Sequence, residues 1–207
     1  RPRAEGLALH DAVREIIDDY LKTHAPDRHR ALHERAAAYF EYQAGKAKRE
    51  TEKEGFILER LYHLICGGNE SQAIEESQVT LEMALGYYRR FFAEGIIALL
   101  EKELKGESSR DWLAYLRWLV IKMSPQINEQ VIIGQLLVKL LERPSIEPRL
   151  WALVAVAIGD LPGESNVPTD KQIAWLEKAI ASDFLSPRDT ALGYLHLGGA
   201  YLAKAEW

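Results

Sequence analysis

Two histidines four residues apart are the first feature of this 207-residue sequence that could do chemistry. In a helix, His29 and His33 would lie one turn apart on one face, where both imidazoles could bind the same metal ion. Glu34 is adjacent, but zinc needs three or four ligands, and the other candidate, His24, lies across a proline turn. We therefore expect no metal ion, and we interpret this segment as a solvated, partly basic helix face.

The single cysteine, Cys66, is the only thiol that could act as a nucleophile. His63 would share its helix face, but nucleophilic catalysis also needs a group that orients the base. Free cysteine is among the most buried residue types, so we assign Cys66 to core packing. One cysteine forms no internal disulfide, which is typical of a reducing compartment, and we expect a cytoplasmic location.

Sequence motifs for catalysis are absent. The chain has no Gly-x-x-x-x-Gly-Lys-Ser/Thr phosphate loop and no Gly-x-Ser-x-Gly nucleophile elbow, so we expect no enzymatic activity, no catalytic residue and no cofactor in this chain. The net charge of -5 argues against a nucleic-acid surface. The longest apolar run, residues 150–158, is far shorter than the roughly 20 residues of a membrane span.

Aromatic residues and arginines lie together in segment 87–92. Such a combination can stack bases or bind the acidic side chains of a partner. The alternative, which we favour, is that the aromatic residues pack between helices while the arginines point to water. The same core assignment applies to the tryptophans at helical spacing: Trp112, Trp118, Trp151 and Trp175.

Apolar residues recur at three- and four-residue intervals through nearly the whole chain, which predicts helices. The expected ranges are 9–24, 27–45, 53–66, 70–85, 87–104, 109–123, 125–141, 150–158, 170–182 and a last helix from 187. The expected apolar stripe of the second helix consists of Leu32, Ala36, Tyr39 and Phe40. Gly86 either separates two helices or lies inside one long helix. Asp27 and Thr169 are predicted N-caps, and segment 67–68 is a predicted left-handed C-cap. Pro26 is expected to end the first helix, and Ser186 with Pro187 to start the last.

Helix pairs return at roughly 35 to 40 residues, the period of helical repeat arrays. We therefore predict an all-α fold, a right-handed solenoid of antiparallel helix pairs. A single irregular all-helical domain without repeats is the alternative.

The last two predicted helices carry a family resemblance. Tyr194, Leu197, Gly198 and Tyr201 stand in the order Tyr-x-x-Leu-Gly-x-x-Tyr, which resembles the first helix of a tetratricopeptide repeat (TPR). Gly198 would let the partner helix approach closely, with Leu197 and Tyr201 on the packing face. Segment 173–180 is similar to a second repeat helix, with a small residue, Ala179, at the close contact.

The start of the chain carries a second resemblance. Residues 7–17 resemble the end of the winged-helix domain in STAND-class signalling ATPases, with Leu9 at the Met position of a Met-His-Asp motif. Residues 29–40 and 61–70 are similar to the helical region that follows it. The resemblance implies that His10 senses the diphosphate of bound ADP and that Asp11 supports its geometry. Alternatively, His10 is an ordinary helix-start residue and Asp11 favours the positive end of the helix.

Together these resemblances imply a domain organisation and a function. Residues 1–25 would be a winged-helix remnant, and residues 26–207 a TPR-like domain truncated within its last repeat. The chain would be a non-catalytic recognition module that binds a protein, peptide or small effector, with no membrane or nucleic-acid partner. It would couple that binding to an upstream nucleotide-binding domain of the same polypeptide, where ADP or ATP would be held. The alternatives are a TPR-like scaffold without a nucleotide switch, or the arm of an ATPase-type transcription regulator.

Overall fold

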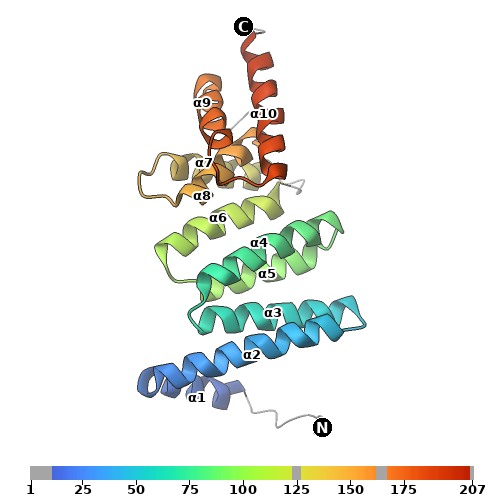
Figure 1. The fold of residues 1–207 in the computed structure, drawn as a ribbon, viewed down its shortest axis with the longest axis vertical. Helices are drawn as coiled ribbons and strands as arrows, with labels where there is room; N and C mark the ends of the chain where they lie inside the picture. The colour runs from blue at the N-terminus through green and yellow to red at the C-terminus, as the bar shows by residue number, and fades with distance from the viewer. Residues whose placement is uncertain (1–10, 123–126, 162–166, 206–207) are drawn as a thin grey trace. The chain divides into compact units, whose positions relative to one another are not determined.

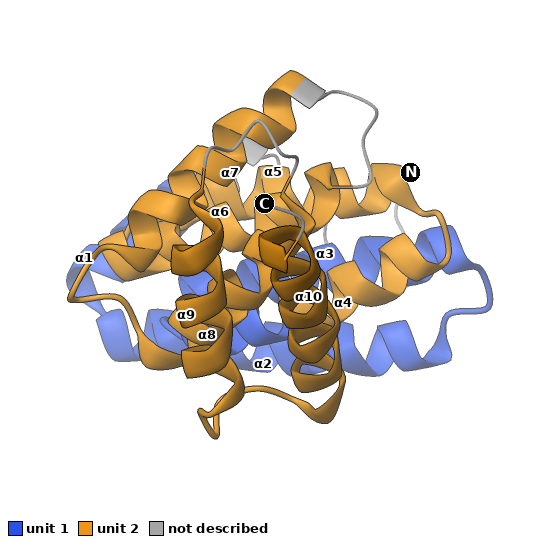
Figure 2. Ribbon diagram, turned by 90° about the horizontal axis from the view of Figure 1, so that it is seen from above, with its two compact units in different colours: residues 1–76 blue, residues 77–207 orange. Residues whose placement is uncertain are grey.

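The computed structural model describes residues 11–122, 127–161 and 167–205. Every regular element in these ranges is helical, which confirms the predicted all-α class (Figure 1). No helix in the described ranges has the length and apolar character needed to cross a membrane. The chain divides into two compact units, Arg1–Glu76 and Ser77–Trp207 (Figure 2). The predicted domain boundary after residue 25 comes from a family resemblance and not from the compactness of the fold, so it stays a prediction.

Unit 1 consists of α1 (Asp11–His24), α2 (Pro26–Lys46), α3 (Glu50–Cys66) and the first part of α4 (Glu70–Gly86). Pro26 ends α1 as predicted, because a residue before proline disfavours the helical region. Pro26 also begins α2, where its missing N–H costs no hydrogen bond, so Ala25 is the N-cap. The predicted cap at Asp27 is therefore wrong.

A glycine ends α3. Gly68 has a φ of +84°, the left-handed conformation that favours glycine. The N–H of Asn69 donates to the carbonyl of Leu64 at 2.8 Å, and the N–H of Gly68 donates to that of Ile65 at 3.0 Å. The left-handed C-cap is confirmed at Gly68 but not at Gly67, whose φ is -76°.

Arg60 connects three helices of unit 1. Its Nε and Nη2 donate to the two carboxylate oxygens of Glu76 on α4, both at 2.7 Å. Its Nη1 donates to Glu41 and to the carbonyl of Ala37 on α2, at 2.7 Å and 3.1 Å. Burial raises the pKa of Glu76, but hydrogen bonds from Arg60 and Gln72 outweigh it and leave that pKa below its ordinary value.

Unit 2 contains the rest of α4 and seven further elements in the described ranges. These are α5 (Arg90–Glu103), α6 (Glu107–Ile121), α7 (Ile127–Leu141), α8 (Pro148–Ala157), the 3-10 turn η1 (Ile158–Asp160), α9 (Thr169–Ile180) and α10 (Pro187–Ala205). Residues 152–158 are all buried, as expected for the longest apolar run of the sequence. Of the two alternatives at Gly86, the structure has a break between two helices, because α4 ends at this residue.

Two start signals in unit 2 have different outcomes. Ser186 precedes α10 as predicted, and its Oγ accepts the N–H of Asp189 at 3.1 Å while donating to the Asp189 carboxylate at 2.6 Å. Thr169 is instead the first residue of α9, and its N-cap is Pro168. The predicted Thr169 cap is wrong because proline itself supplies a suitable φ for the helix start.

Among the described helices, α10 approaches its neighbours closely at Gly193. The partner helix expected at Gly198 is not among the described helices, so that expectation stays a prediction. A Cβ on Gly193 would lie 3.0 Å from Cγ1 of Ile180, whereas a Cβ on Gly198 would meet nothing within 4 Å. Gly193 and Ala200, seven residues apart, are buried on the packing face of α10. Residue 198 follows Gly193 by five residues, so it lies on another side of the helix. Tyr201 is 47% exposed. On α9, Ala179 is fully buried as predicted.

Candidate functional site

The predicted nucleotide-sensing residues are not tested by the structure. His10 lies outside the described residues, and Asp11 is the first residue of α1 but its side chain lies outside the described part of the chain. Their assignment stays a prediction from resemblance.

A short turn between α4 and α5 exposes three aromatic side chains of unit 2. Tyr87, Tyr88 and Phe91 are 78%, 90% and 92% exposed. Val79 and Met83, also exposed, precede Tyr87 at four-residue intervals on one face of α4. We call these five residues the aromatic patch. The prediction that the aromatic residues of segment 87–92 pack between helices is wrong for Tyr87, Tyr88 and Phe91.

The backbone of this turn has an unusual conformation at Tyr88. Tyr88 has a φ of +58°, a left-handed conformation that is unfavourable for an aromatic residue. The N–H of Arg89 donates to the carbonyl of Ala84 at 2.8 Å, and the N–H of Tyr88 donates to that of Leu85 at 3.1 Å. Many helices end at a residue in this left-handed conformation, which is usually a glycine; here the residue is a tyrosine. The Tyr88 side chain, almost fully exposed, packs little against the fold, which leaves it available for a contact outside the chain.

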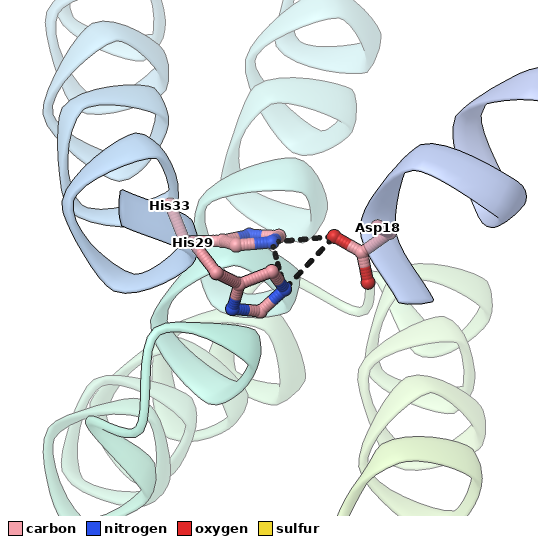
Figure 3. Close-up of side chains that lie close together, drawn as sticks. All are labelled: Asp18, His29 and His33. Atoms are coloured by element: carbon pink, nitrogen blue, oxygen red, sulfur yellow. Dashed lines mark hydrogen bonds and ion pairs between the residues drawn. The ribbon is translucent and has the colours of Figure 1, made fainter. Parts of the chain in front are cut away.

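The two predicted candidate histidines of unit 1 lie in a buried polar cluster. His29 and His33 are only 6% and 7% exposed, so the predicted solvated helix face is wrong at both positions. Nε2 of each histidine lies 2.9 Å from Oδ1 of Asp18 on α1, and the two Nε2 atoms lie 3.1 Å apart (Figure 3). The cluster thus brings three possible metal ligands together.

The electrostatics of the cluster favour a negative Asp18. Burial raises the pKa of Asp18, but the hydrogen bonds and positive charge of His33 and His29 outweigh burial and hold that pKa below its ordinary value. On the far side of the His33 ring, Nδ1 lies 2.8 Å from Nδ1 of His63 on α3. One of these two nitrogens must donate and the other accept.

Asp18 was not among the candidate third ligands from the sequence, which were Glu34 and His24. Glu34 is exposed, and the metal-ligand cluster of the described residues does not include it. His24 stacks on Tyr20 at 4.4 Å between ring centroids, and its Nδ1 donates to the Tyr20 carbonyl at 3.0 Å. We expected no metal ion because the sequence offered no suitable third ligand. Asp18 is a possible third ligand in the structure. The sequence signal that could have identified this third ligand was a carboxylate on the helix that precedes the two histidines.

A second histidine–carboxylate pair lies in unit 2. Nδ1 of His196 donates to the carbonyl of Val156 at 2.9 Å, and Nε2 lies 3.1 Å from Oδ1 of Asp160. Both partners are acceptors, so only the doubly protonated imidazolium can make both bonds. The hydrogen bond to Asp160 accordingly raises the pKa of His196, and the same bond lowers the pKa of Asp160.

The stability of unit 2 should therefore depend on pH through this pair. A raised histidine pKa contributes stability that is complete below the unfolded value of about 6.5 and is lost as pH rises through the folded value. The lowered Asp160 pKa contributes stability above about pH 4, lost as pH falls through its folded value. We expect Asp160→Asn to cost about 1 kcal/mol near pH 5.5 and less above neutral pH.

Urea unfolding followed by tryptophan fluorescence measures this difference in unit 2, because all five tryptophans lie after residue 111. A difference between wild type and Asp160→Asn that stays constant from about pH 5.5 to about pH 9 would show that His196 is not its source.

The remaining sequence candidates have structural roles. Trp112 and Trp118 are buried as predicted, whereas Trp151 and Trp175 are half-buried with lysines, Lys178 and Lys171, over their rings at 4.2 Å and 4.8 Å. Cys66 is half-buried, so its assignment to the core is correct only in part.

Comparison of the chain with models of known protein families, with curated proteins and with solved structures finds no match. Two features of the described residues are candidates for binding something outside the chain: the aromatic patch of unit 2 and the Asp18–His29–His33 cluster of unit 1.

Proposed function

We propose that this chain is a non-catalytic helical recognition module that binds a protein through the aromatic patch. The observation that carries the proposal is the exposure of Tyr87, Tyr88 and Phe91, each more than three-quarters exposed at one turn. Exposed clusters of large apolar side chains mark interaction sites, and aromatic residues are enriched among those that contribute most to binding.

The chemistry of the patch favours a protein over the other partner classes. Small effectors bind in concave sites that bury most of the ligand, whereas these side chains project from the surface. A nucleic acid needs free cations beside the aromatic rings, but Nε of Arg90 already pairs with Glu94 at 2.8 Å and the chain carries a net charge of -5. An apolar surface on the partner fits the patch best.

The finer architecture belongs to the same proposal. In this proposal, residues 26–207 would belong to a right-handed TPR-like solenoid, and residues 1–25 would be a winged-helix remnant of a larger STAND-type signalling ATPase. The resemblances at residues 7–17 and 194–201 support this arrangement. Partner binding would act on the ATPase only through different affinities for its two nucleotide states. Residue His10, at the junction, would report which nucleotide is bound.

The double variant Tyr88→Ser, Phe91→Ser tests the recognition site in the full-length protein. A photo-crosslinking residue at position 91 first identifies the partner, and the affinity of the purified partner is then measured by calorimetry. We expect the double variant to weaken binding by about 30-fold or more, because the loss of even one aromatic anchor that contributes about 2 kcal/mol has that effect. The fold should be unchanged, because both side chains are at least 90% exposed.

Phe184→Ser is the matched control, since Phe184 is an exposed phenylalanine of unit 2 outside the patch. We expect it to bind the partner as wild type does. Equal affinities for wild type and the double variant would refute the recognition site. Full-length protein that retains no ADP after purification would leave a scaffold without a nucleotide switch as the better proposal.

A further inference from the structure

We propose that Asp18, His29 and His33 bind one divalent zinc ion, and that His63 orients His33 as a ligand. This proposal concerns unit 1 alone and does not depend on the aromatic patch. It rests on the positions of three donor atoms, on the way their protons must be arranged, and on the attachment of α1.

The three donor atoms have nearly the spacing that a zinc ion imposes. Oδ1 of Asp18 and the two Nε2 atoms form a triangle with sides of 2.9, 2.9 and 3.1 Å. Zinc binds nitrogen and oxygen at about 2.0–2.2 Å, so two ligands of a tetrahedral ion lie about 3.3 Å apart. Outward shifts of a few tenths of an ångström would therefore admit the ion without a change of rotamer.

The protons of the cluster are poorly accommodated without an ion. If both Nε2 atoms donate to Asp18 Oδ1, two N–H groups whose nitrogens lie only 3.1 Å apart converge on one oxygen, and the contact between the two histidines is then not a hydrogen bond. An ion replaces both protons and accepts a lone pair from each ligand. Nδ1 of His33 then carries its proton and donates to Nδ1 of His63 at 2.8 Å, the type of outer contact that fixes a metal-bound imidazole.

The donor set favours a borderline divalent ion such as zinc over a hard cation. Two imidazoles and one carboxylate suit zinc, whose open sites commonly have three protein ligands and one water. Calcium and magnesium prefer oxygen ligands, and no sulfur ligand belongs to the described cluster. The side chain of Asp18 is 34% exposed, which leaves a route for the ion and room for a water ligand.

Zinc would determine how firmly α1 is attached to α2. Of the α1 side chains at positions 16–24, none is buried, and Ile16, Ile17 and Tyr20 are exposed. Positions 16–24 of α1 therefore gain little from apolar burial, and among the described side chains the contact of Asp18 with His29 and His33 links this helix to α2. An ion shared by the two helices would replace a hydrogen-bonded contact with coordinate bonds.

Calorimetric titration of the chelator-treated full chain with Zn²⁺ tests the site. We expect one ion per chain for wild type and an affinity lower by about 100-fold or more for Asp18→Asn and His29→Ala. Asp18→Asn is the variant that keeps the fold, because the amide oxygen still accepts a hydrogen bond from either histidine. Replacement of His63 by Phe should weaken binding by about 10–100-fold, as for other groups that orient a ligand.

His24→Ala is the matched control, because His24 is an exposed histidine of the same helix as Asp18 and lies outside the cluster. We expect wild-type affinity for it, and slower hydrogen exchange in residues 16–24 when zinc is added to wild type but not to Asp18→Asn. The proposal is overturned if wild type binds no zinc, if Asp18→Asn and His29→Ala bind as wild type does, or if zinc leaves hydrogen exchange in residues 16–24 unchanged.

Discussion

Replacing Gly159 by alanine is expected to lower the free energy of unfolding of unit 2 by about 2–3 kcal/mol. A Cβ at this position would overlap the His196 ring. The ring has little freedom to move aside, because Nδ1 is bonded to the Val156 carbonyl and Nε2 pairs with Asp160. Relief of the overlap would break at least one of these bonds. Urea unfolding monitored by tryptophan fluorescence gives the change for unit 2.

Gly198→Ala is the matched control for Gly159→Ala. A Cβ at position 198 would meet nothing within 4 Å, and the residue lies inside α10. Alanine is the better helix former, so we expect an increase of up to about 1 kcal/mol. Equal destabilisation by both variants would show that the overlap with His196 is not the cause.

Truncation of Trp118 is expected to have the largest effect on stability in the chain. Its side chain, on α6, is fully buried, and Trp118→Ala should cost about 3–5 kcal/mol through lost packing and the cavity left behind. Its Nε1 has no hydrogen-bond partner among the described residues. Trp118→Phe therefore loses packing but no hydrogen bond, and we expect it to cost only about 1–2 kcal/mol.

Phe91→Ala provides the comparison for an aromatic residue of the same unit. Phe91 is 92% exposed, so its truncation should change the free energy of unfolding by no more than about 0.5 kcal/mol. Denaturant unfolding of the three variants checks this order. If Trp118→Ala were no more destabilising than Phe91→Ala, the core position of Trp118 would be wrong.

Local signals in the sequence were enough to predict the helices and several of their ends. Pro26 separates α1 from α2, Gly68 ends α3, and Ser186 caps α10, because each effect depends only on the residue's own φ or on a hydrogen bond within one turn. The choice between a break and a long helix at Gly86 needed the structure, because glycine is tolerated in both.

The candidate site depended on packing between helices, which the sequence of one helix does not contain. The predicted apolar stripe of α2 included Tyr39, which is 50% exposed, whereas the buried face carries His29, His33 and Ala37. The rotation of α2 is set by its contact with α3, and Asp18 joins the histidines from a different helix. Similarly, the left-handed conformation of Tyr88 is imposed by the helix end and not by its side chain.

X-ray diffraction at the zinc absorption edge, on crystals of the full chain soaked in Zn²⁺, tests the metal site most directly. We expect one anomalous peak at about 2.0–2.2 Å from Oδ1 of Asp18 and from Nε2 of His29 and His33. Crystals of Asp18→Asn should lack that peak. Zinc bound at other residues, with no anomalous peak between these three donor atoms in wild-type crystals, would contradict the proposed ligand set.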